Sequence, residues 1–445
     1  MSQTLPTGLP ANLPFDEGFF SHFTDIMDDM MTTKENPLAD SPYVIGMMGG
    51  TSLDGLDAVL CQFYEIDEDN DEPVEILATV SEPFPDDLRA VLLALTQPNG
   101  VAQLIADDNL AFESELDVFG WASVFYAEFA ANLVNQLLEK AQVTPDEVTA
   151  IGCHGQTVRH RPQWSFSLQL LDPNVLAERT AIAVVSDFRR RDMAVGGQGA
   201  PLVPAFHQAM FAAPPYHADK VMPKVILNLG GIANITVLDG SDEVIGFDTG
   251  VANLLIDAWC QRHTQQAYDH NGDWGKSGQV LEPLLSLLLT HPFFAKPFPK
   301  STGREEFNLA WLDAMLEQLG QQFPNLAYSP ADVQATLVAL TAKSVSDAIV
   351  SVTHASQGEL FVCGGGALNA YLMSRLQDNL ATWSIQTTDK IGLSPLWVEA
   401  VAFAWLAQQT ILNVPSNLPS VTGANKKVVL GQVCFYHGMY FLRRQ

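Results

Sequence analysis

Two stretches of the chain repeat one pattern, in which a short apolar run, a glycine pair and a second apolar run follow one another. They are VIGMMGGTSLDGLDAVL at residues 44–60 and VILNLGGIANITVL at residues 225–238. Short apolar runs that meet at glycines are typical of strands joined by a tight turn. The two hairpins stand about 180 residues apart, which fits two α/β domains of ordinary size. The repeat therefore predicts an α/β fold with mixed sheets, built from two related halves.

Other segments fit the same architecture. The apolar spacing predicts amphipathic helices at residues 86–95 and 120–138. A third glycine-rich element, LFVCGGG at residues 360–366, leads into a helix expected at residues 369–378. Short apolar runs predict strands at residues 43–48, 58–63, 75–80 and 149–153.

The charge balance restricts the partners of the chain. It has 51 Asp and Glu residues against 23 Lys and Arg residues, which gives a formal net charge of −28. Nucleic acids and anionic membrane surfaces both bind basic proteins, so we expect neither as a partner. No uninterrupted apolar run is long enough to cross a bilayer, so no membrane-spanning helix is expected.

Cysteine usage and the N-terminus indicate a cytoplasmic protein. The five cysteines are odd in number and include no CxxC pair, which favours a reducing compartment over a disulfide framework or structural zinc. The N-terminal sequence MSQTLPTGLPANLPFDEG lacks the basic and apolar regions of a signal peptide. Residues 1–42 are expected to be an N-terminal extension that either forms a short helix or is disordered.

The turn of the first hairpin can bind an anion, because glycines let an anionic oxygen approach the backbone N–H groups. Thr51 and Ser52 follow the glycines and add two hydroxyl donors. Asp54 and Asp57 are candidates to hold Mg²⁺ through water, since Mg²⁺ prefers oxygen ligands. An ordinary tight hairpin is the alternative interpretation. The second hairpin and the GGG element favour a nucleotide.

Two other motifs do not meet the requirements of their classes. GDWGKSG at residues 272–278 has His270 where a P-loop needs its first glycine, and no apolar strand precedes it. Asp248-Thr249-Gly250 matches the triplet of aspartic proteases, which need two such carboxylates. The chain contains no second DTG or DSG, so both readings are set aside.

Eight motifs in order resemble one known family. They are GTSLDGLDA, IGCHGQTVRH, SDFRRRDMAVGGQGAPLVPAFH, LNLGGIANIT, GFDTGVANLLIDAW, KSTGREEFNL, VCGGGALN and WVEAVAFAWLA. Their order resembles that of the anhydro-N-acetylmuramic acid kinases, which belong to the actin-like ATPase superfamily. The resemblance extends from Tyr43 to Leu430.

This resemblance implies a two-lobed actin-like ATPase (ribonuclease H-like) fold with ATP in a central cleft. The first lobe would comprise residues 43–185 with 395–445, and the second residues 186–394. Gly230 and Gly231 would form the second phosphate loop. The first phosphate loop and the residues under the adenosine would be Gly50, Thr51, Ser52, Leu53, Asp54, Gly55, Leu56, Asp57, and Gly364, Gly365 and Gly366.

The family reaction implied by the resemblance uses Mg²⁺ and ATP. Water opens the intramolecular 1,6-anhydro bond of the sugar while O6 takes the γ-phosphoryl group, which gives N-acetylmuramic acid 6-phosphate. Attack at the anomeric carbon needs a base that removes a proton from water. By resemblance this base is Asp248, which follows the apolar run VIGF. Its alternative role is to cap the helix expected at residues 253–262.

The sugar carries a lactyl carboxylate, so a cation is expected beside it. Glu399 stands on an apolar helix, where a charge is costly unless it is used. The candidate substrate-binding residues are Arg189, Arg190, Arg191, Glu399, His154, Gln156 and Thr157. For the arginines the alternative is a solvated face or ion pairs with neighbouring aspartates, and for His154 a structural role.

Two alternatives to the family reaction stay open at this point. The chain could be an ATP-dependent kinase of another amino sugar, or a non-catalytic ATP-binding regulator. The family pattern also implies a homodimer. Four residues depart from that pattern, namely Gly49, Leu171, Ala181 and Val251.

Overall fold

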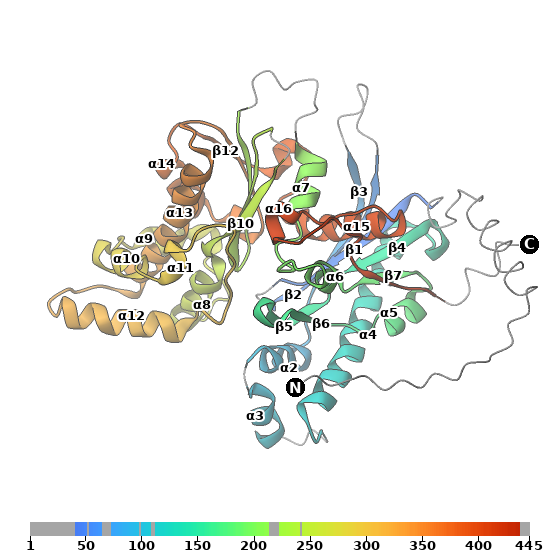
Figure 1. Ribbon diagram of the computed structural model, residues 1–445. Helices are drawn as coiled ribbons and strands as arrows, with labels where there is room; N and C mark the ends of the chain where they lie inside the picture. The colour runs from blue at the N-terminus through green and yellow to red at the C-terminus, as the bar shows by residue number, and fades with distance from the viewer. Residues whose placement is uncertain are drawn as a thin grey trace, which may run out of the picture.

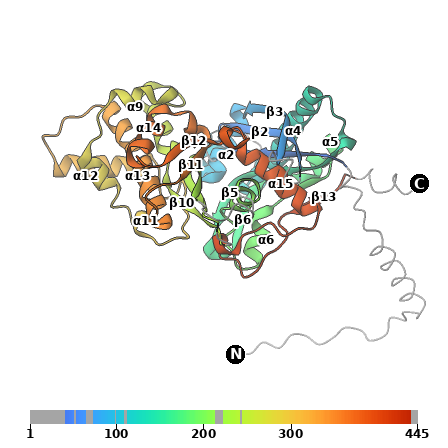
Figure 2. The same ribbon diagram turned by 90° about the horizontal axis from the view of Figure 1, so that it is seen from above.

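The computed structural model describes residues 41–50, 53–64, 73–97, 99–107, 112–212, 222–240 and 243–436. Two large sheets lie side by side in it, each with its own helices (Figures 1 and 2). Thr51 and Ser52 of the predicted first phosphate loop lie outside the described residues, as does the predicted extension up to residue 40.

The first sheet has the strand order β13-β7-β4-β1-β2-β3. A separate two-stranded hairpin, β5 (Gln156–Arg161) and β6 (Phe166–Leu170), follows β4. The strands of the first sheet are β1 (Tyr43–Met48), β2 (Gly55–Phe63), β3 (Val74–Pro83), β4 (Val148–Cys153), β7 (Val184–Ser186) and β13 (Gln432–Cys434).

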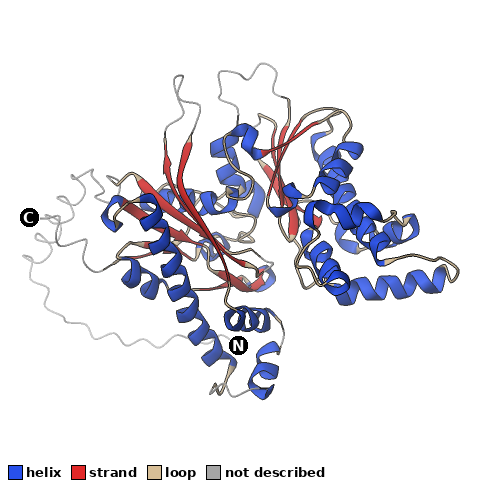
Figure 3. Cartoon of the chain, turned by 180° about the vertical axis from the view of Figure 1, so that it is seen from behind, coloured by secondary structure: helices blue, strands red, loops and turns tan. Residues whose placement is uncertain are grey.

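The second sheet has the strand order β10-β9-β8-β11-β12. Its helices lie beside the strands, as Figure 3 shows from behind. The strands are β8 (Lys224–Leu229), β9 (Ile232–Leu238), β10 (Ile245–Val251), β11 (Glu359–Cys363) and β12 (Ser384–Thr387).

Both sheets repeat one set of strand directions. In the first, β2 and β3 run antiparallel beside β1, and β4 and β7 continue in parallel on its other side. In the second, β9 and β10 run antiparallel beside β8, and β11 and β12 continue in parallel. This repetition confirms the predicted duplication and the mixed-sheet α/β fold of actin-like type. The predicted strand at residues 43–48 agrees with β1 at both ends.

The helices of the two lobes follow the same division along the chain. Around the first sheet they are α2 (Asp86–Thr96), α3 (Gly100–Asp107), α4 (Glu115–Ala141), α5 (Pro173–Thr180), α6 (Phe188–Ala194) and α15 (Val398–Ile411). Around the second they are α8 (Asn253–Thr264), α9 (Asp273–Ser277), α10 (Glu282–Leu288), α11 (Pro292–Ala295), α12 (Leu309–Gln322), α13 (Pro330–Thr353) and α14 (Ala370–Asn379), while α7 (Pro204–Phe211) and α16 (Pro419–Thr422) contact β9 and β10.

The predicted lobe limits at residues 185 and 394 stay a prediction. The residues just after 185 form α6, which packs against β6 of the first lobe. Asp192 on α6 accepts hydrogen bonds from Thr422 Oγ1 at 2.8 Å and Asn417 Nδ2 at 2.9 Å. These contacts join α6 to the segment that follows α15.

Helix α15 lies on the first sheet at two glycines. A Cβ added to Gly46 of β1 would overlap the carbonyl oxygen of Ala400 and come within 2.7 Å of Ala404 N. A Cβ added to Gly152 of β4 would overlap the carbonyl oxygen of Phe403. Only glycine at both positions lets the helix backbone approach the strands this closely.

Side-chain alternation gives each face of the sheets its own core. On the first sheet, Ile45 packs under α4 and Val44 packs with α15, on the opposite face. Ile226 of β8 and Phe361 of β11 reach the same cluster as Phe403 of α15. Helix α15 therefore belongs to a core that joins both lobes.

Helix α13 is long and apolar enough to cross a membrane by length and composition alone. About two thirds of its most apolar window, 67%, is buried inside the protein. It packs against β9, β10 and α8 in the second lobe, as a core helix of the fold does.

The structure shows the surroundings of two of the four residues that depart from the family pattern. Ala181 ends α5 with a left-handed φ of 57°, a conformation that favours glycine. Val251 is the last residue of β10 and is buried in the core of the second lobe.

We expect Gly46→Ala to lower the free energy of unfolding by about 3 kcal/mol, because the methyl group overlaps the backbone of α15. Gly320→Ala is the matched control, since Gly320 is exposed on α12 and has nothing within 4 Å of an added Cβ. It should stabilise the chain by about 0.5–1 kcal/mol through helix propensity. Thermal unfolding compares the two, and an unchanged midpoint for Gly46→Ala would contradict the packing described here.

Candidate functional site

Asp248 lies on the edge strand β10 at a β-bulge. The register passes from Asp248 opposite Asn234 to Gly250 opposite Ala233, so Thr249 is the extra residue. The hydroxyl of Thr249 donates to Ala233 O at 3.2 Å. Bulges of this kind change the direction of a side chain beside a site. Helix α8 has Ala252 as its N-cap residue, so Asp248 does not cap it.

The segment 300–302 forms hydrogen bonds with both the backbone and the side chain of Asp248. The amide of Asp248 donates to Lys300 O at 3.0 Å, and the amide of Thr302 donates to Asp248 Oδ2 at 3.0 Å. Burial raises the pKa of Asp248 to about 7, although the Thr302 amide and the charge of Arg189 act in the opposite direction. A carboxyl with this pKa can accept a proton near neutral pH.

Arg189 is the arginine of the triplet that lies close enough to Asp248 to lower its pKa. Its Nε donates to His154 Nε2 at 3.0 Å and its Nη1 donates to Gly199 O at 2.8 Å. Burial lowers its pKa to about 10, while the charges of Glu399 and Asp248 keep the guanidinium protonated.

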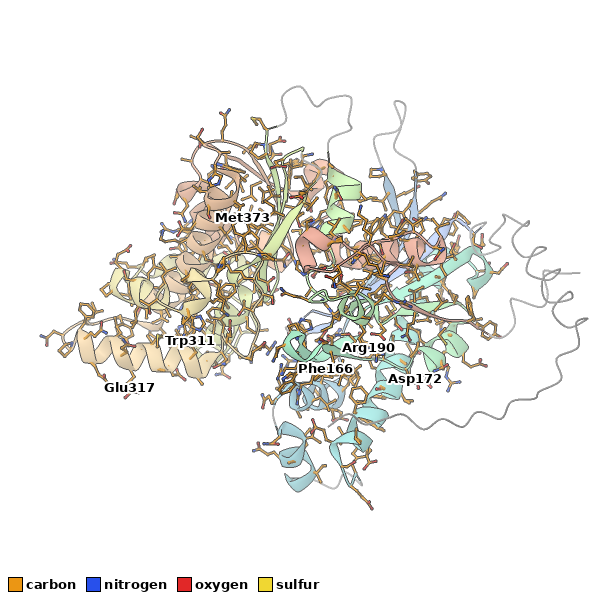
Figure 4. The ribbon with its side chains drawn as sticks, viewed as in Figure 1. Phe166, Asp172, Arg190, Trp311, Glu317 and Met373 are labelled. Atoms are coloured by element: carbon orange, nitrogen blue, oxygen red, sulfur yellow. The ribbon has the colours of Figure 1, made fainter. Side chains whose placement is uncertain are left out.

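The other two arginines of the triplet are exposed. Arg190, which is labelled in Figure 4, pairs with Asp187, with its Nε 2.8 Å from Asp187 Oδ1. Arg191 lies at the surface beside Lys427 and Asn413. The structure therefore brings one of the three predicted cations to Asp248 and leaves the other two outside.

Glu399 enters the cluster from the first turn of α15. Its Oε1 accepts a hydrogen bond from Asn228 Nδ2 at 3.1 Å, across the two lobes. Burial is the main cause that raises its pKa, and the charge of Asp57 raises it further while Arg189 lowers it. Glu399, Asp57, Arg189 and Asp248 thus share one electrostatic environment.

His154 and Gln156 lie at the end of β4, beside this cluster. His154 is 4% exposed, and burial followed by the charge of Arg189 holds its pKa well below the usual value. It is therefore neutral and accepts from Arg189 through Nε2. Gln156 is 2% exposed, and its Oε1 would lie 3.2 Å from a Cβ added to Gly49. Thr157 follows on β5 and accepts from Gln169.

The described residues of the first predicted phosphate loop include two apolar side chains and two aspartates. Leu53 and Leu56 are buried in the first-lobe core, and Gly55 begins β2. Asp54 is exposed, with Oδ1 3.6 Å from Arg89 Nη2. Asp57 accepts from Ser81 Oγ at 2.6 Å, and burial raises its pKa.

The second hairpin and the GGG element pack against each other. The carbonyls of Gly230 and Gly231 accept from the amides of Asn253 at 3.1 Å and Ala252 at 3.0 Å, so the turn caps α8. Gly364 has a left-handed φ of 81°, and a Cβ there would lie 2.5 Å from Asn228 Oδ1. A Cβ added to Gly366 would lie 2.6 Å from Leu229 Cβ, while Gly365 is exposed.

Asp54 and Asp57 are suited to a hydrated cation rather than a protein-built metal centre. In the described part of the chain, no three His, Cys, Asp or Glu side chains are grouped so that they could hold a metal ion. Mg²⁺ usually keeps several waters and takes one or two carboxylates together with substrate phosphates. These two aspartates fit that mode beside the predicted phosphate loop.

Sequence reasoning missed three residues that the structure adds to the candidate site. Asn253 donates through Nδ2 to Leu229 O at 3.0 Å and so joins α8 to the second hairpin. Asp257, one turn further on, has a pKa raised to about 7 by burial and by the charges of Asp54 and Asp269. Thr302 holds Asp248 through its backbone, and only its place in the KSTGREEFNL motif could have pointed to it.

The comparisons with known proteins agree on one family. A family model described as anhydro-N-acetylmuramic acid kinase matches residues 42–436. A protein of that name from Psychrobacter cryohalolentis is 56% identical over 437 residues, which cover 94% of this chain and 100% of the relative. One from Acinetobacter baylyi is 46% identical over 396 residues, which cover 87% of this chain and 98% of the relative.

Solved structures show a more distant likeness. The activator of 2-hydroxyisocaproyl-CoA dehydratase from Clostridium difficile is 12% identical, with a TM-score of 0.40 over 83% of this chain and 96% of that one. A likeness at this level carries no argument about function.

We expect Gly364→Ala to lower the thermal unfolding midpoint by several degrees, because its methyl group meets Asn228 Oδ1 and, at 2.7 Å, Leu229 O. Gly365→Ala is the neighbouring control, since the nearest atom to its added Cβ is Asn253 Nδ2 at 3.8 Å. It should leave the midpoint unchanged. Equal midpoints for the two variants would refute the packing of this loop.

Proposed function

The chain belongs to the anhydro-N-acetylmuramic acid kinase family, and from this we propose that it opens 1,6-anhydro-N-acetylmuramic acid with water and phosphorylates O6 with ATP. The products are N-acetylmuramic acid 6-phosphate and ADP, in cell-wall recycling and amino-sugar catabolism. The relatives, all named for this activity, do not favour a kinase of another amino sugar or a non-catalytic regulator.

One observation carries the mechanism, namely the half-buried Asp248 carboxyl with a pKa of about 7. Asp248 takes a proton from the water that attacks the anomeric carbon. The bond from that carbon to O6 breaks, and O6 attacks the γ-phosphorus of ATP, so that ADP leaves. No separate base is needed for O6, because it is released as the acceptor. The proton on Asp248 then passes to solvent.

We assign the lactyl carboxylate of the sugar to Arg189 rather than to Arg190 or Arg191. A guanidinium that is already partly desolvated forms a stronger charge-assisted hydrogen bond than an exposed one. His154 supports this role, since its neutral ring accepts from Arg189 Nε and leaves Arg189 Nη2 without a hydrogen bond in the described residues. Glu399, Gln156 and Thr157 are proposed to contact the sugar hydroxyl groups.

The phosphates of ATP are proposed to lie between the two glycine hairpins, with the adenosine against Gly364, Gly365 and Gly366. Mg²⁺, held through water by Asp54 and Asp57, would neutralise phosphate charge when bound. Phosphoryl transfer depends mainly on such positioning and charge neutralisation.

The cellular setting is also a proposal. The described cysteines are all free thiols, which supports a reducing compartment and so the cytoplasm. A homodimer is proposed from family membership.

We expect kcat/KM to fall about tenfold for each pH unit below about pH 7 and to level off above it. Asp248 must be ionised to act as a base, and its raised pKa places that transition near pH 7. Asp248→Asn should lower kcat by at least about a hundredfold and leave ATP affinity near the wild-type value. A coupled assay for ADP measures both, and full activity of Asp248→Asn would remove Asp248 from the mechanism.

A further inference from the structure

The β5–β6 hairpin carries a row of polar side chains that the mechanism above uses only at Thr157. Gln169 Nε2 donates to Thr157 Oγ1 at 3.0 Å and to Ser167 Oγ at 2.8 Å. Ser167 Oγ lies 3.0 Å from His160 Nδ1. The four side chains form one chain of hydrogen bonds across the two strands.

A β-bulge at Val158 places these side chains on one face. Thr157 pairs with Gln169 and His160 pairs with Ser167, so β5 has one residue more than β6 between the pairs. In a regular strand Thr157 and His160 would point to opposite faces, and the bulge brings them to the same one.

The hairpin is also fixed to the rest of the first lobe. The guanidinium of Arg159 donates to the carbonyl of Leu95 and, at 3.1 Å, to that of Gln97, at the end of α2. Helix α6, which carries Arg189, packs against β6 (Figure 4 labels Phe166 and Arg190 on these two elements). The hairpin that carries the polar side chains is therefore fixed in position, and it lies next to the helix that carries Arg189.

Three atoms at this row are buried and have no hydrogen-bond partner in the described part of the chain. They are Gln169 Oε1, His160 Nε2 and, at the root of the hairpin, Gln156 Oε1. A buried polar group without a partner is destabilising by about 1–3 kcal/mol. Such a group beside a binding site indicates a ligand that supplies the missing hydrogen bond.

The polar row is neutral at pH 7, and this determines which kind of ligand it can bind. Burial, followed by the charges of Arg189 and Arg161, lowers the pKa of His160 to about 4, so the ring is neutral at pH 7. Ser167 Oγ lies 3.0 Å from His160 Nδ1 and 3.4 Å from its other acceptor, Arg159 O. We assign the hydroxyl hydrogen to the shorter contact, so that the neutral ring presents Nε2–H as a donor. Gln169 presents Oε1 as an acceptor. One neutral donor beside one neutral acceptor complements an amide group.

We propose that His160 and Gln169 bind the acetamido group of the sugar, with His160 Nε2–H donating to its carbonyl and Gln169 Oε1 accepting from its N–H. This assignment rests on the proposed function. It agrees with the connectivity of the sugar, because the acetamido group and the lactyl ether are on adjacent ring carbons. His160 likewise lies close enough to Arg189 for that charge to lower its pKa.

The test measures binding of two sugars to the full chain by calorimetry without ATP. One sugar is 1,6-anhydro-N-acetylmuramic acid, and the other has a hydroxyl group in place of the acetamido group and keeps the lactyl carboxylate. We expect the wild type to bind the first about tenfold more tightly, as one or two neutral hydrogen bonds would give. Gln169→Ala should remove most of this preference and weaken binding of the second sugar much less than binding of the first.

Gln163→Ala is the matched control, since Gln163 is exposed at the tip of the same hairpin. It should keep the full preference. His160→Asn is the second variant, because asparagine can replace the contact of Nδ1 with Ser167 and lacks the Nε2–H donor. It should lose the preference while the hairpin stays intact.

The assignment would be overturned if Gln169→Ala and His160→Asn lowered the affinity for both sugars equally. A purely structural role of the two residues would give that result. A wild type that binds the two sugars equally would overturn the assignment as well. A wild type that prefers the acetamido sugar but does not phosphorylate it would contradict the proposed function and support this subsite, so the two failures are distinguishable.

Discussion

The arrangement of the candidate site depends on the contact between the backbone of α15 and two glycines of the first sheet, Gly46 and Gly152. Without side chains at these positions the helix lies directly on β1 and β4, and its first turn brings Glu399 to Asn228 of the second lobe. The same helix shares its apolar side chains with Ile226 and Phe361. The packing of the lobes and the position of Glu399 beside Asn228 therefore have one cause.

The second constraint is charge. In a chain with a net charge of −28, Asp248 and Glu399 lie close enough to Arg189 to act on its pKa, and Asp57 acts in turn on Glu399. Burial raises the pKa of all three carboxyls, and the guanidinium limits this effect at Asp248 and Glu399. The site thus combines a base that titrates near neutral pH with a cation that can receive a carboxylate.

Sequence reasoning recovered the features that depend on local pattern. The strand at residues 43–48, both glycine hairpins and the helix after the GGG element follow from residue periodicity and turn chemistry. The inward direction of Arg189 could not be predicted, because three adjacent arginines look alike until α6 is placed. The Asn228–Glu399 bond joins residues 171 positions apart, and the bulge at Val158 appears only when β5 and β6 are paired. The roles of the site residues remain predictions.

The central claim is that Asp248 activates water for attack at the anomeric carbon while O6 becomes the phosphoryl acceptor. Turnover of 1,6-anhydro-N-acetylmuramic acid with ATP and Mg²⁺ in heavy-oxygen water tests it most directly, with the position of the label read by mass spectrometry of the product. The account predicts one heavy oxygen at the anomeric position and none in the phosphate. A phosphorylated product without label at the anomeric carbon would contradict it.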